Sequence, residues 1–295
     1  MPELPDVLVY IERLTPLILG QPVIAVRLGS PFVLRTVEPP LKSLEGRTIT
    51  GIRRLGKRIV LAAEGDLFVV IHLMIAGRLR WRPKGKSLRG KLVLAEFTFT
   101  DGSLYLTEAG SKRRASIHVV EGEAALAAFE RGGLEVMTAT LDQFAARLRS
   151  ENHTLKRALT DPRLLSGIGN AYSDEILYCV KLPPLLLTSR ITDDQLAALF
   201  DATRSTLAEW TDRLRAEAGD TFPEKVTAFH EDMAVHGRFR KPCPVCGAPV
   251  QRIRYAENET NYCARCQTGG RVLADRSLSR LLKDDWPRNI DEWEA

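Results

Sequence analysis

The hydrophobic pattern changes twice along the chain, and this predicts an α+β fold built from three consecutive parts. Residues 5–19 carry apolar side chains at helical spacing, and Asp6 can cap the start of that helix. Over residues 22–120, short runs of β-forming residues alternate with Gly, Pro and Asp-Gly turns. This pattern predicts about seven antiparallel strands in a sandwich or barrel. Helical spacing follows, and a cysteine-bearing segment comes last, so we expect domains at 1–135, 136–235 and 236–295.

The composition is that of an ordinary globular protein with a small positive charge. Lys and Arg number 42 against 37 Asp and Glu, which gives a net charge of +5 and a pI of about 9.0. A mildly basic surface fits nucleic acid or anionic lipid without deciding between them. No apolar run reaches the roughly 18 residues of a membrane span, and the acidic, proline-containing start is unlike a signal peptide. We therefore expect a cytoplasmic protein with no membrane partner.

Four of the five cysteines have the spacing of a zinc ribbon. Cys243 and Cys246 form one C-x2-C knuckle, and Cys263 and Cys266 form a second after sixteen residues. Four thiolates can surround Zn²⁺ tetrahedrally and leave no open position for substrate, so we expect one structural zinc. In a reducing compartment a disulfide between them is not expected. The fifth, Cys179, lies in an apolar helical segment and is predicted to be a core residue.

Residues 152–180 are predicted to form two helices around a glycine-containing loop, Leu-Ser-Gly-Ile-Gly-Asn. A helix N-terminus preceded by glycines presents free backbone N–H groups to an anion. Arginines near the cysteine knuckles would either contact phosphates or form a solvated surface. They are Arg238, Arg240, Arg252, Arg254 and Arg265.

These features together resemble the formamidopyrimidine-DNA glycosylase/endonuclease VIII family. The shared motifs are the Met-Pro-Glu-Leu-Pro-Asp start, Lys57 in RRLGKRIVL, His72 in HLMIAG, residues 156–172, and the zinc ribbon. The resemblance covers residues 1 to about 267 and implies a β-sandwich with a leading helix, a helix–two-turn–helix domain and a zinc finger. It also implies a monomeric bacterial DNA glycosylase/AP lyase of base-excision repair, found with the nucleoid. Its partner would be double-stranded DNA carrying a damaged base or an abasic site.

The implied catalytic residues are Pro2, Glu3 and Lys57. A small second residue permits removal of Met1, which exposes the secondary amine of Pro2, and an α-amino group titrates near ~7.7–8.0. Such an amine can attack C1′ of a damaged nucleoside, and the resulting iminium then acidifies the C2′ proton. By resemblance, Glu3 would act as general acid/base at the sugar. Lys57 would contact the phosphate beside the lesion and assist elimination.

The resemblance also implies which residues hold DNA. The loop at Gly169 and Asn170, with Lys156 upstream, would clamp the DNA backbone together with the zinc finger. A flipped nucleotide leaves a gap, which Met74 or Ile75 would fill. His72 fits a packed core residue as well as a DNA contact. The full expected DNA-binding set is Lys156, Gly169, Asn170, Arg254, Met74, Ile75 and Arg113.

Several positions depart from the family pattern. Asp6 stands where relatives usually have glutamate, and Asn258 stands where they have an arginine credited with the δ elimination. Arg254 is the candidate to replace that arginine. The loop at 111–115 lacks the family's aromatic wedge, which leaves opposite-base selectivity open. The choice between oxidised purines and oxidised pyrimidines depends on this loop and on residues 219–237, and also stays open.

A further departure is the length of the tail, because 29 residues follow Cys266. Residues 275–283 are predicted to form a helix, followed by Trp286 and Trp293. This tail would either cover the finger or dock a partner.

Two other functions compete with the bifunctional enzyme. One is a catalytically silent DNA-damage binding protein, for which Asn258 and the missing aromatic leave room, although Pro2, Glu3 and Lys57 argue against it. The other is an unrelated zinc-ribbon nucleic-acid-binding protein, which accounts for the tail but not for the start of the chain.

Overall fold

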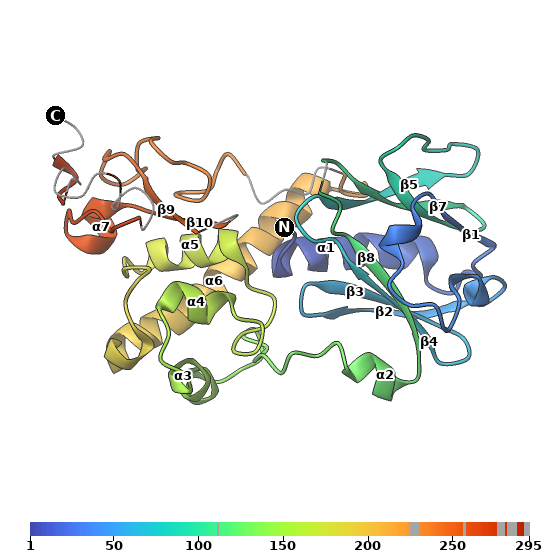
Figure 1. The fold of residues 1–295 in the computed structure, drawn as a ribbon, viewed down its shortest axis with the longest axis horizontal. Coiled ribbons are helices and arrows are strands. Elements are labelled where there is room, and N and C mark those ends of the chain that lie inside the picture. The colour runs from blue at the N-terminus through green and yellow to red at the C-terminus, as the bar shows by residue number, and fades with distance from the viewer. Residues whose placement is uncertain (111, 225–229, 256–257, 276–280, 282–287, 292–295) are drawn as a thin grey trace. The chain divides into compact units, whose positions relative to one another are not determined.

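The computed structural model describes the chain except for residues 111, 225–229, 256–257, 276–280, 282–287 and 292–295. It forms two compact units, each described by itself (Figure 1). The first comprises Met1–Arg131 and Glu209–Thr227, and the second Gly132–Ala208 and Ala228–Ala295. In the part of the chain described, no helix is both long and apolar enough to cross a membrane.

Two four-stranded antiparallel sheets make up most of the first unit, which confirms the expected sandwich. One sheet has the order β1-β6-β7-β5, with β1 at Ala25–Leu28, β6 at Val93–Thr98, β7 at Gly102–Glu108 and β5 at Gly77–Pro83. The other has the order β2-β3-β4-β8, with β2 at Ile49–Leu55, β3 at Arg58–Ala63, β4 at Leu67–His72 and β8 at Ser116–Glu121. Short helices η1 (Pro31–Val33), η2 (Leu41–Leu44) and α2 (Glu123–Ala127) connect or follow the strands.

The core of the sandwich is shared by both sheets and by helix α1 (Leu4–Ile18). Ile59 on β3 and Ile71 on β4 are fully buried in this core, while their neighbours Val60 and Val70 are buried in a second cluster, because successive side chains of a strand point to opposite faces. Helix α1 adds an apolar stripe that includes Tyr10 and Leu14 and contacts β2 and β3. Each large apolar side chain buried in this way contributes roughly 1.5–3 kcal/mol. The start of the chain is thereby anchored to the core.

The second unit combines the helical segments with the finger. Its helices are α3 (Leu141–Arg149), α4 (Leu155–Thr160), α5 (Asn170–Cys179), η3 (Thr188–Arg190) and the first part of α6 (Asp193–Ala218). The finger has the antiparallel hairpin β9 (Gln251–Tyr255) and β10 (Asn258–Tyr262), followed by α7 (Ala264–Thr268). The last residues of α6, from Glu209, belong to the first unit.

The prediction that Cys179 is a core residue is wrong, because its side chain is exposed. Helix α5 ends at Cys179, and its buried face is completed earlier by Ile176 and Leu177. The next residues leave the helix, with Lys181 in the left-handed region at φ 55°.

The tail beyond Cys266 adds to the core of the finger where it is described. Val272, Leu273 and Ile290 are buried in one cluster with the cysteines, and Val272 N–H donates to the carbonyl of Arg288. Nearly all of the helix predicted at 275–283, together with Trp286 and Trp293, lies outside the described residues.

Candidate functional site

The first residues of the chain are held at the start of α1. Pro2 is buried, Glu3 is 1% exposed and Asp6 is 2% exposed. The Asp6 carboxylate accepts a hydrogen bond from the backbone N–H of Glu3 at 2.7 Å. Because burying a carboxylate is costly without hydrogen bonds, this contact offsets part of that cost and fixes how the chain enters the helix.

The charges around this terminus are shifted by burial. Burial lowers the pKa of the α-amino group of Met1, an effect opposed by Glu3 and Asp6 and reinforced by Arg78 and Lys57. Burial also raises the pKa of Asp6 to about 7, and the nearby Glu3 carboxylate adds to this while the Glu3 N–H opposes it. Oδ1 of Asp6 has no hydrogen-bond partner among the described residues. The chain thus begins in a site of low polarity with an amine and two carboxyl groups.

Lys57 lies in the two-residue turn between β2 and β3. Gly56 precedes it at φ 61°, a conformation that glycine adopts without steric cost. Burial lowers the pKa of Lys57, while the Glu3 carboxylate raises it and Arg58 lowers it further. The structure therefore brings Lys57 into electrostatic contact with Glu3, although 54 positions separate them in the sequence.

Residues 73–76 form the turn between β4 and β5. Met74 adopts φ 54°, which is uncommon for a residue with a side chain, and Ile75 is 50% exposed. A Cβ at Gly77 would lie 2.2 Å from the carbonyl oxygen of Leu73, so this turn requires glycine. At the base of the turn, burial lowers the pKa of His72 to about 4, aided by Arg58 and Lys57, so its imidazole is neutral at pH 7. The turn presents an apolar side chain to solvent.

Arg113 lies in the loop between β7 and β8, of which Ser111 is outside the described residues. The buried carboxylate of Glu108 accepts hydrogen bonds from the backbone N–H groups of Arg114 and Ala115 at 2.9 and 3.1 Å. The exposed guanidinium of Arg113 donates to the carbonyl of Lys91 at 2.8 Å. The Glu108 carboxylate therefore holds the end of the loop in place through its backbone, and the Arg113 side chain remains at the surface.

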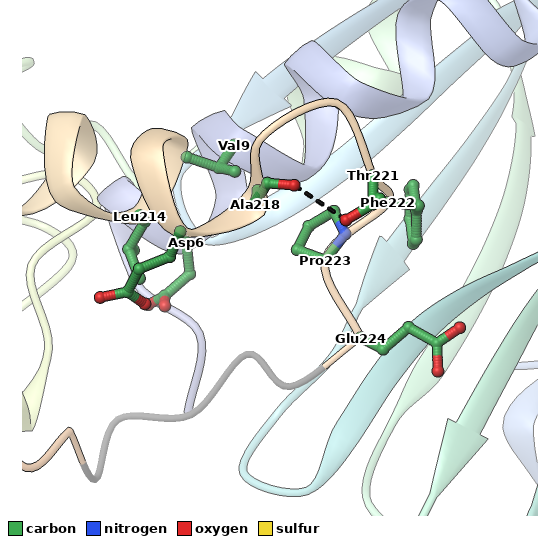
Figure 2. A pocket seen from close by; sticks show the side chains of 9 residues that line it. Asp6, Val9, Leu214, Ala218, Thr221, Phe222, Pro223 and Glu224 are labelled. Atoms are coloured by element: carbon green, nitrogen blue, oxygen red, sulfur yellow. Dashed lines mark hydrogen bonds between the residues drawn. The ribbon is translucent and has the colours of Figure 1, made fainter.

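A cavity of about 390 Å³ lies beside Asp6 in the first unit (Figure 2). Its walls come from α1, from the last turn of α6 and from the segment that follows. The lining residues are Asp6, Val9, Leu214, Glu217, Ala218, Thr221, Phe222, Pro223 and Glu224. From the sequence we expected residues 219–237 to influence the choice of lesion. The sequence did not indicate that the first of these residues would line one cavity with Asp6.

Lys156, which we expected to contact DNA, has a largely buried side chain. Its side chain is 10% exposed, and Nζ forms an ion pair with Asp174 Oδ1 at 2.5 Å. The same ammonium donates to the carbonyl of Asn170 at 2.6 Å and to Ser173 Oγ at 2.8 Å. A buried ammonium needs such partners, and here they tie α4 to the start of α5. Lys156 therefore supports the Gly169–Asn170 loop from within.

Asp174 also contacts His236, whose Nδ1 lies 2.8 Å from Oδ2. The neighbouring carboxylate of Glu175 accepts hydrogen bonds from three consecutive backbone N–H groups, those of Ala234, Val235 and His236, at 2.7, 2.9 and 2.9 Å. Burial raises the pKa of Glu175, an effect that these hydrogen bonds oppose. Adjacent acids on α5 thus hold the segment that leads into the finger, a role that no spacing in the sequence indicated.

The glycine-containing loop also lies against the finger hairpin. Gly169 precedes the first turn of α5, and the side-chain amide of Asn170 donates to the carbonyl of Glu259 at 2.7 Å. Glu259 pairs with Arg254 across the hairpin, and Arg254 is exposed. The backbone N–H of Arg254 donates to Asp275 at 2.7 Å. The structure therefore brings Gly169, Asn170 and Arg254 together within the second unit.

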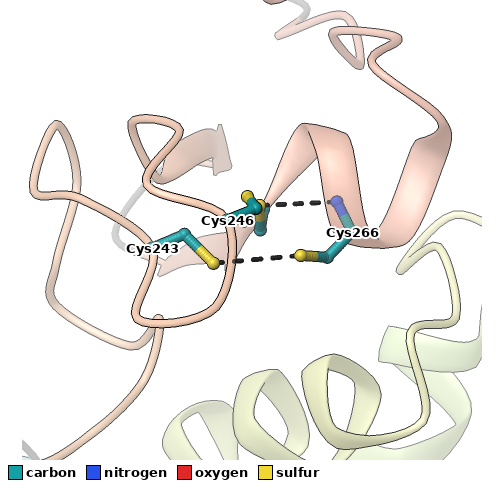
Figure 3. A group of neighbouring side chains, drawn as sticks. Cys243, Cys246 and Cys266 are labelled. Carbon is teal, nitrogen blue, oxygen red and sulfur yellow. Dashed lines mark hydrogen bonds between the residues drawn. The ribbon is translucent and has the colours of Figure 1, made fainter.

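The four knuckle cysteines form one cluster (Figure 3). Their Sγ atoms all lie within 4.8 Å of one another, with Cys243 and Cys266 at 3.9 Å and Cys246 and Cys263 at 3.4 Å. Zn–S bonds of about 2.3 Å in a tetrahedron place sulfurs about 3.8 Å apart, so the cluster fits one structural zinc. The hydroxyl of Tyr178 on α5 lies 3.2 Å from Cys243 Sγ and can donate to that thiolate.

The Asp6 carboxyl makes stability depend on pH. Its pKa is about 7 in the fold against an ordinary value of 3.8, so folding favours the protonated form. The free energy of unfolding should therefore fall as pH rises from about 4 to about 7 and level off above that. Asp6→Asn, which stays uncharged, should lose this fall when melting temperatures are measured across the range. The exposed Asp201→Asn is the matched control, and identical pH slopes for wild type and Asp6→Asn would contradict the assignment.

Loss of one zinc ligand should weaken metal binding and loosen the second unit. Cys246→Ser is expected to lower zinc affinity at least about 100-fold, because a structural site depends on all four thiolates. Cys179→Ser, which removes an exposed cysteine outside the cluster, should keep one zinc per chain. Zinc content by mass spectrometry of metals and thermal unfolding check both variants. Equal zinc retention in the two would refute the ligand assignment.

The chain matches three family models: the Formamidopyrimidine-DNA glycosylase N-terminal domain over residues 1–113, the Formamidopyrimidine-DNA glycosylase H2TH domain over 134–215, and the Zinc finger found in FPG and IleRS over 240–269. The formamidopyrimidine-DNA glycosylase of Thermus thermophilus is 33% identical, covering 92% of this chain and 100% of the relative. That of Solibacter usitatus is 31% identical, over 90% and 99%.

The solved structures agree with the sequence relatives. Wild-type Lactococcus lactis Fpg in complex with an oxidized pyrimidine containing DNA has a TM-score of 0.80 at 26% identity, covering 90% of this chain and 100% of that one. The complex of Lactococcus lactis Fpg with abasic site containing DNA has a TM-score of 0.78 at 25% identity, over 90% and 99%. With an N-terminal β-sandwich, a helical H2TH domain and a four-cysteine finger, this chain belongs to the formamidopyrimidine-DNA glycosylase family.

Proposed function

We propose that the protein is a DNA glycosylase of base-excision repair that also cleaves the DNA backbone, with the amine of Pro2 as its nucleophile. The observation that carries the proposal is the buried start of the chain, where Pro2 and Glu3 lie beside Lys57 and Asp6. An amine surrounded by low polarity has a lowered pKa, and the direction found for the α-amino group at Met1 supports this for the same environment. Removal of Met1 would free the nitrogen of Pro2, which then becomes the terminal amine in this environment.

Base removal would proceed by displacement at the sugar. The lone pair of the Pro2 nitrogen forms a bond to C1′ while the C1′–N glycosidic bond breaks, and the departing base takes up a proton. Glu3, buried next to the nucleophile, is placed to exchange protons with the sugar during ring opening. The nitrogen loses its proton, and the C1′–O4′ bond of the sugar breaks while O4′ takes up a proton, so that the product is an iminium ion between Pro2 and C1′.

Strand cleavage would follow from that iminium. The iminium withdraws electrons from C1′, so a base can remove the C2′ proton. The electron pair of the C2′–H bond then forms a C2′–C3′ double bond, and the C3′–O bond breaks with the 3′ phosphate leaving. Lys57, whose pKa burial lowers, is a suitable proton carrier beside that phosphate. Because Asn258 replaces the family arginine linked to δ elimination, we expect the β product to predominate.

Binding of damaged duplex DNA would use residues of each unit. In the first unit the exposed Ile75 at the tip of the turn with Met74 would fill the gap left by a flipped nucleotide, with Arg113 on a neighbouring loop. The cavity beside Asp6 would receive the flipped base. In the second unit the α5 N-terminus at Gly169 and Asn170 and the exposed Arg254 would contact phosphates. The similar structures of Lactococcus lactis Fpg hold DNA with an oxidized pyrimidine or an abasic site, which supports this class of ligand.

Glu3→Gln should separate binding from chemistry. The variant keeps the size of the side chain but cannot exchange a proton, so base release is expected to slow about 10²–10⁴-fold while affinity for damaged duplex is retained. Pro2→Gly should keep a reduced activity, because its N-terminus still offers an amine. Single-turnover cleavage and gel-shift binding on duplexes with 8-oxoguanine, thymine glycol or an abasic site measure both effects.

The matched control is Glu121→Gln, an exposed glutamate at the end of β8, which should behave as wild type. Wild-type protein that binds every damaged duplex but cleaves none would favour a silent damage-binding protein over the enzyme.

A further inference from the structure

The wall of the cavity beside Asp6 is tied to the sandwich by a cluster of charges. The wall consists of residues 221–224, which follow the end of α6. The Glu224 carboxylate forms an ion pair with Arg80 on β5, Nη1 to Oε2, at 3.0 Å. It also contacts Arg82 on the same strand through both carboxylate oxygens, with Nη2 at 3.3 Å from Oε2. We call the three residues the Glu224 clamp.

Strand β5 offers a fixed support for this clamp. It is paired with β7 along its length, with Arg80 opposite Tyr105 and Arg82 opposite Ser103. Because side chains two positions apart on a strand point to the same face, both guanidinium groups can reach one carboxylate. The two charges stabilise each other. The Arg82 guanidinium lowers the pKa of Glu224, and the Glu224 carboxylate raises the pKa of Arg82.

Two further contacts hold the wall at the cavity, one made by Phe222 and one by Thr221. The ring of Phe222 lies 5.6 Å from that of Tyr10, centroid to centroid, and packs on the sandwich core. The hydroxyl of Thr221 donates to the carbonyl of Ala218 at 2.8 Å (Figure 2).

The exposure of the clamp limits what it contributes to global stability. The side chains of Arg80 and Glu224 are 34% and 35% exposed, so solvent screens their attraction and the ion pair adds little to global stability. Its main effect must therefore be local, on the position of the wall relative to Asp6. A positional error of about 1 Å at a reacting substrate can cost about 100-fold in rate.

We propose that the Glu224 clamp is a specificity-determining positioning element, which holds the wall of residues 221–224 against a base in the cavity. This inference rests on the proposed function. An abasic site has no base to meet the wall, so its cleavage does not need the clamp. Excision of a damaged base does, because the base must stay seated while the nucleophile attacks C1′.

The test compares base excision with abasic-site cleavage in the full-length protein. Glu224→Gln and Arg82→Lys remove the charge or the two-pronged geometry of the clamp. Both should slow single-turnover excision of the best-cleaved base among 8-oxoguanine, a formamidopyrimidine and thymine glycol by about tenfold or more. Cleavage of an abasic-site duplex, and the melting temperature, should stay near the wild-type values. Glu123→Gln, which breaks the exposed ion pair with Arg53 elsewhere in the same unit, is the matched control.

Other results would overturn the proposal. An equal loss on base-bearing and abasic duplexes, or no loss on either, would mean that the clamp does not position a base. Weaker binding of every duplex, damaged or not, by Arg82→Lys but not by Glu224→Gln would instead make the arginines a phosphate contact. Wild-type protein that leaves the abasic duplex uncut would reject the proposed function itself, and the clamp with it.

Discussion

The hydrogen bond from the Glu3 N–H to Asp6 is the constraint on which the proposed chemistry depends. It holds the chain's first residues in the buried entrance to α1, and the sandwich core holds α1 in place. The resulting low polarity lowers the pKa of the terminal amine and raises the pKa of Asp6 to about 7. The amine, the Asp6 carboxyl and the cavity beside it therefore all depend on the anchored start of α1. A nucleophile on the flexible end of a chain becomes useful only when the end is fixed in this way.

The second unit solves a different problem, which is to hold a loop and a finger in one arrangement. Buried charges do this from within: Lys156 and Asp174 support the loop at Asn170, and Glu175 binds the backbone that leads to the finger. The cysteine cluster completes that arrangement and receives a hydroxyl from α5. Such a network is costly to break, because a buried charge left without its partner destabilises the fold by several kcal/mol. Rigid presentation of backbone N–H groups and cations is what phosphate binding requires.

Features set by local spacing could be predicted from the sequence, whereas features set by distant contacts could not. The zinc ligands follow from two C-x2-C knuckles, and the strands follow from alternating residues bounded by turns. The buried charge network was not predictable, because Asp174 lies 18 positions from Lys156 and 62 positions from His236, and no periodic pattern encodes such pairings. The error at Cys179 arose where a helix ended before its apolar pattern did. The cavity and the clamp at Glu224 depend on where the end of α6 lies on the sandwich.

Locating the covalent intermediate decides whether the N-terminal proline is the nucleophile. Wild-type protein is incubated with an abasic-site duplex and sodium borohydride, and the reduced adduct is digested and sequenced by mass spectrometry. One adduct is expected, on Pro2, in chains that have lost Met1. An adduct on Lys57 or another lysine, or a zinc-loaded and processed protein that forms no adduct, would contradict it.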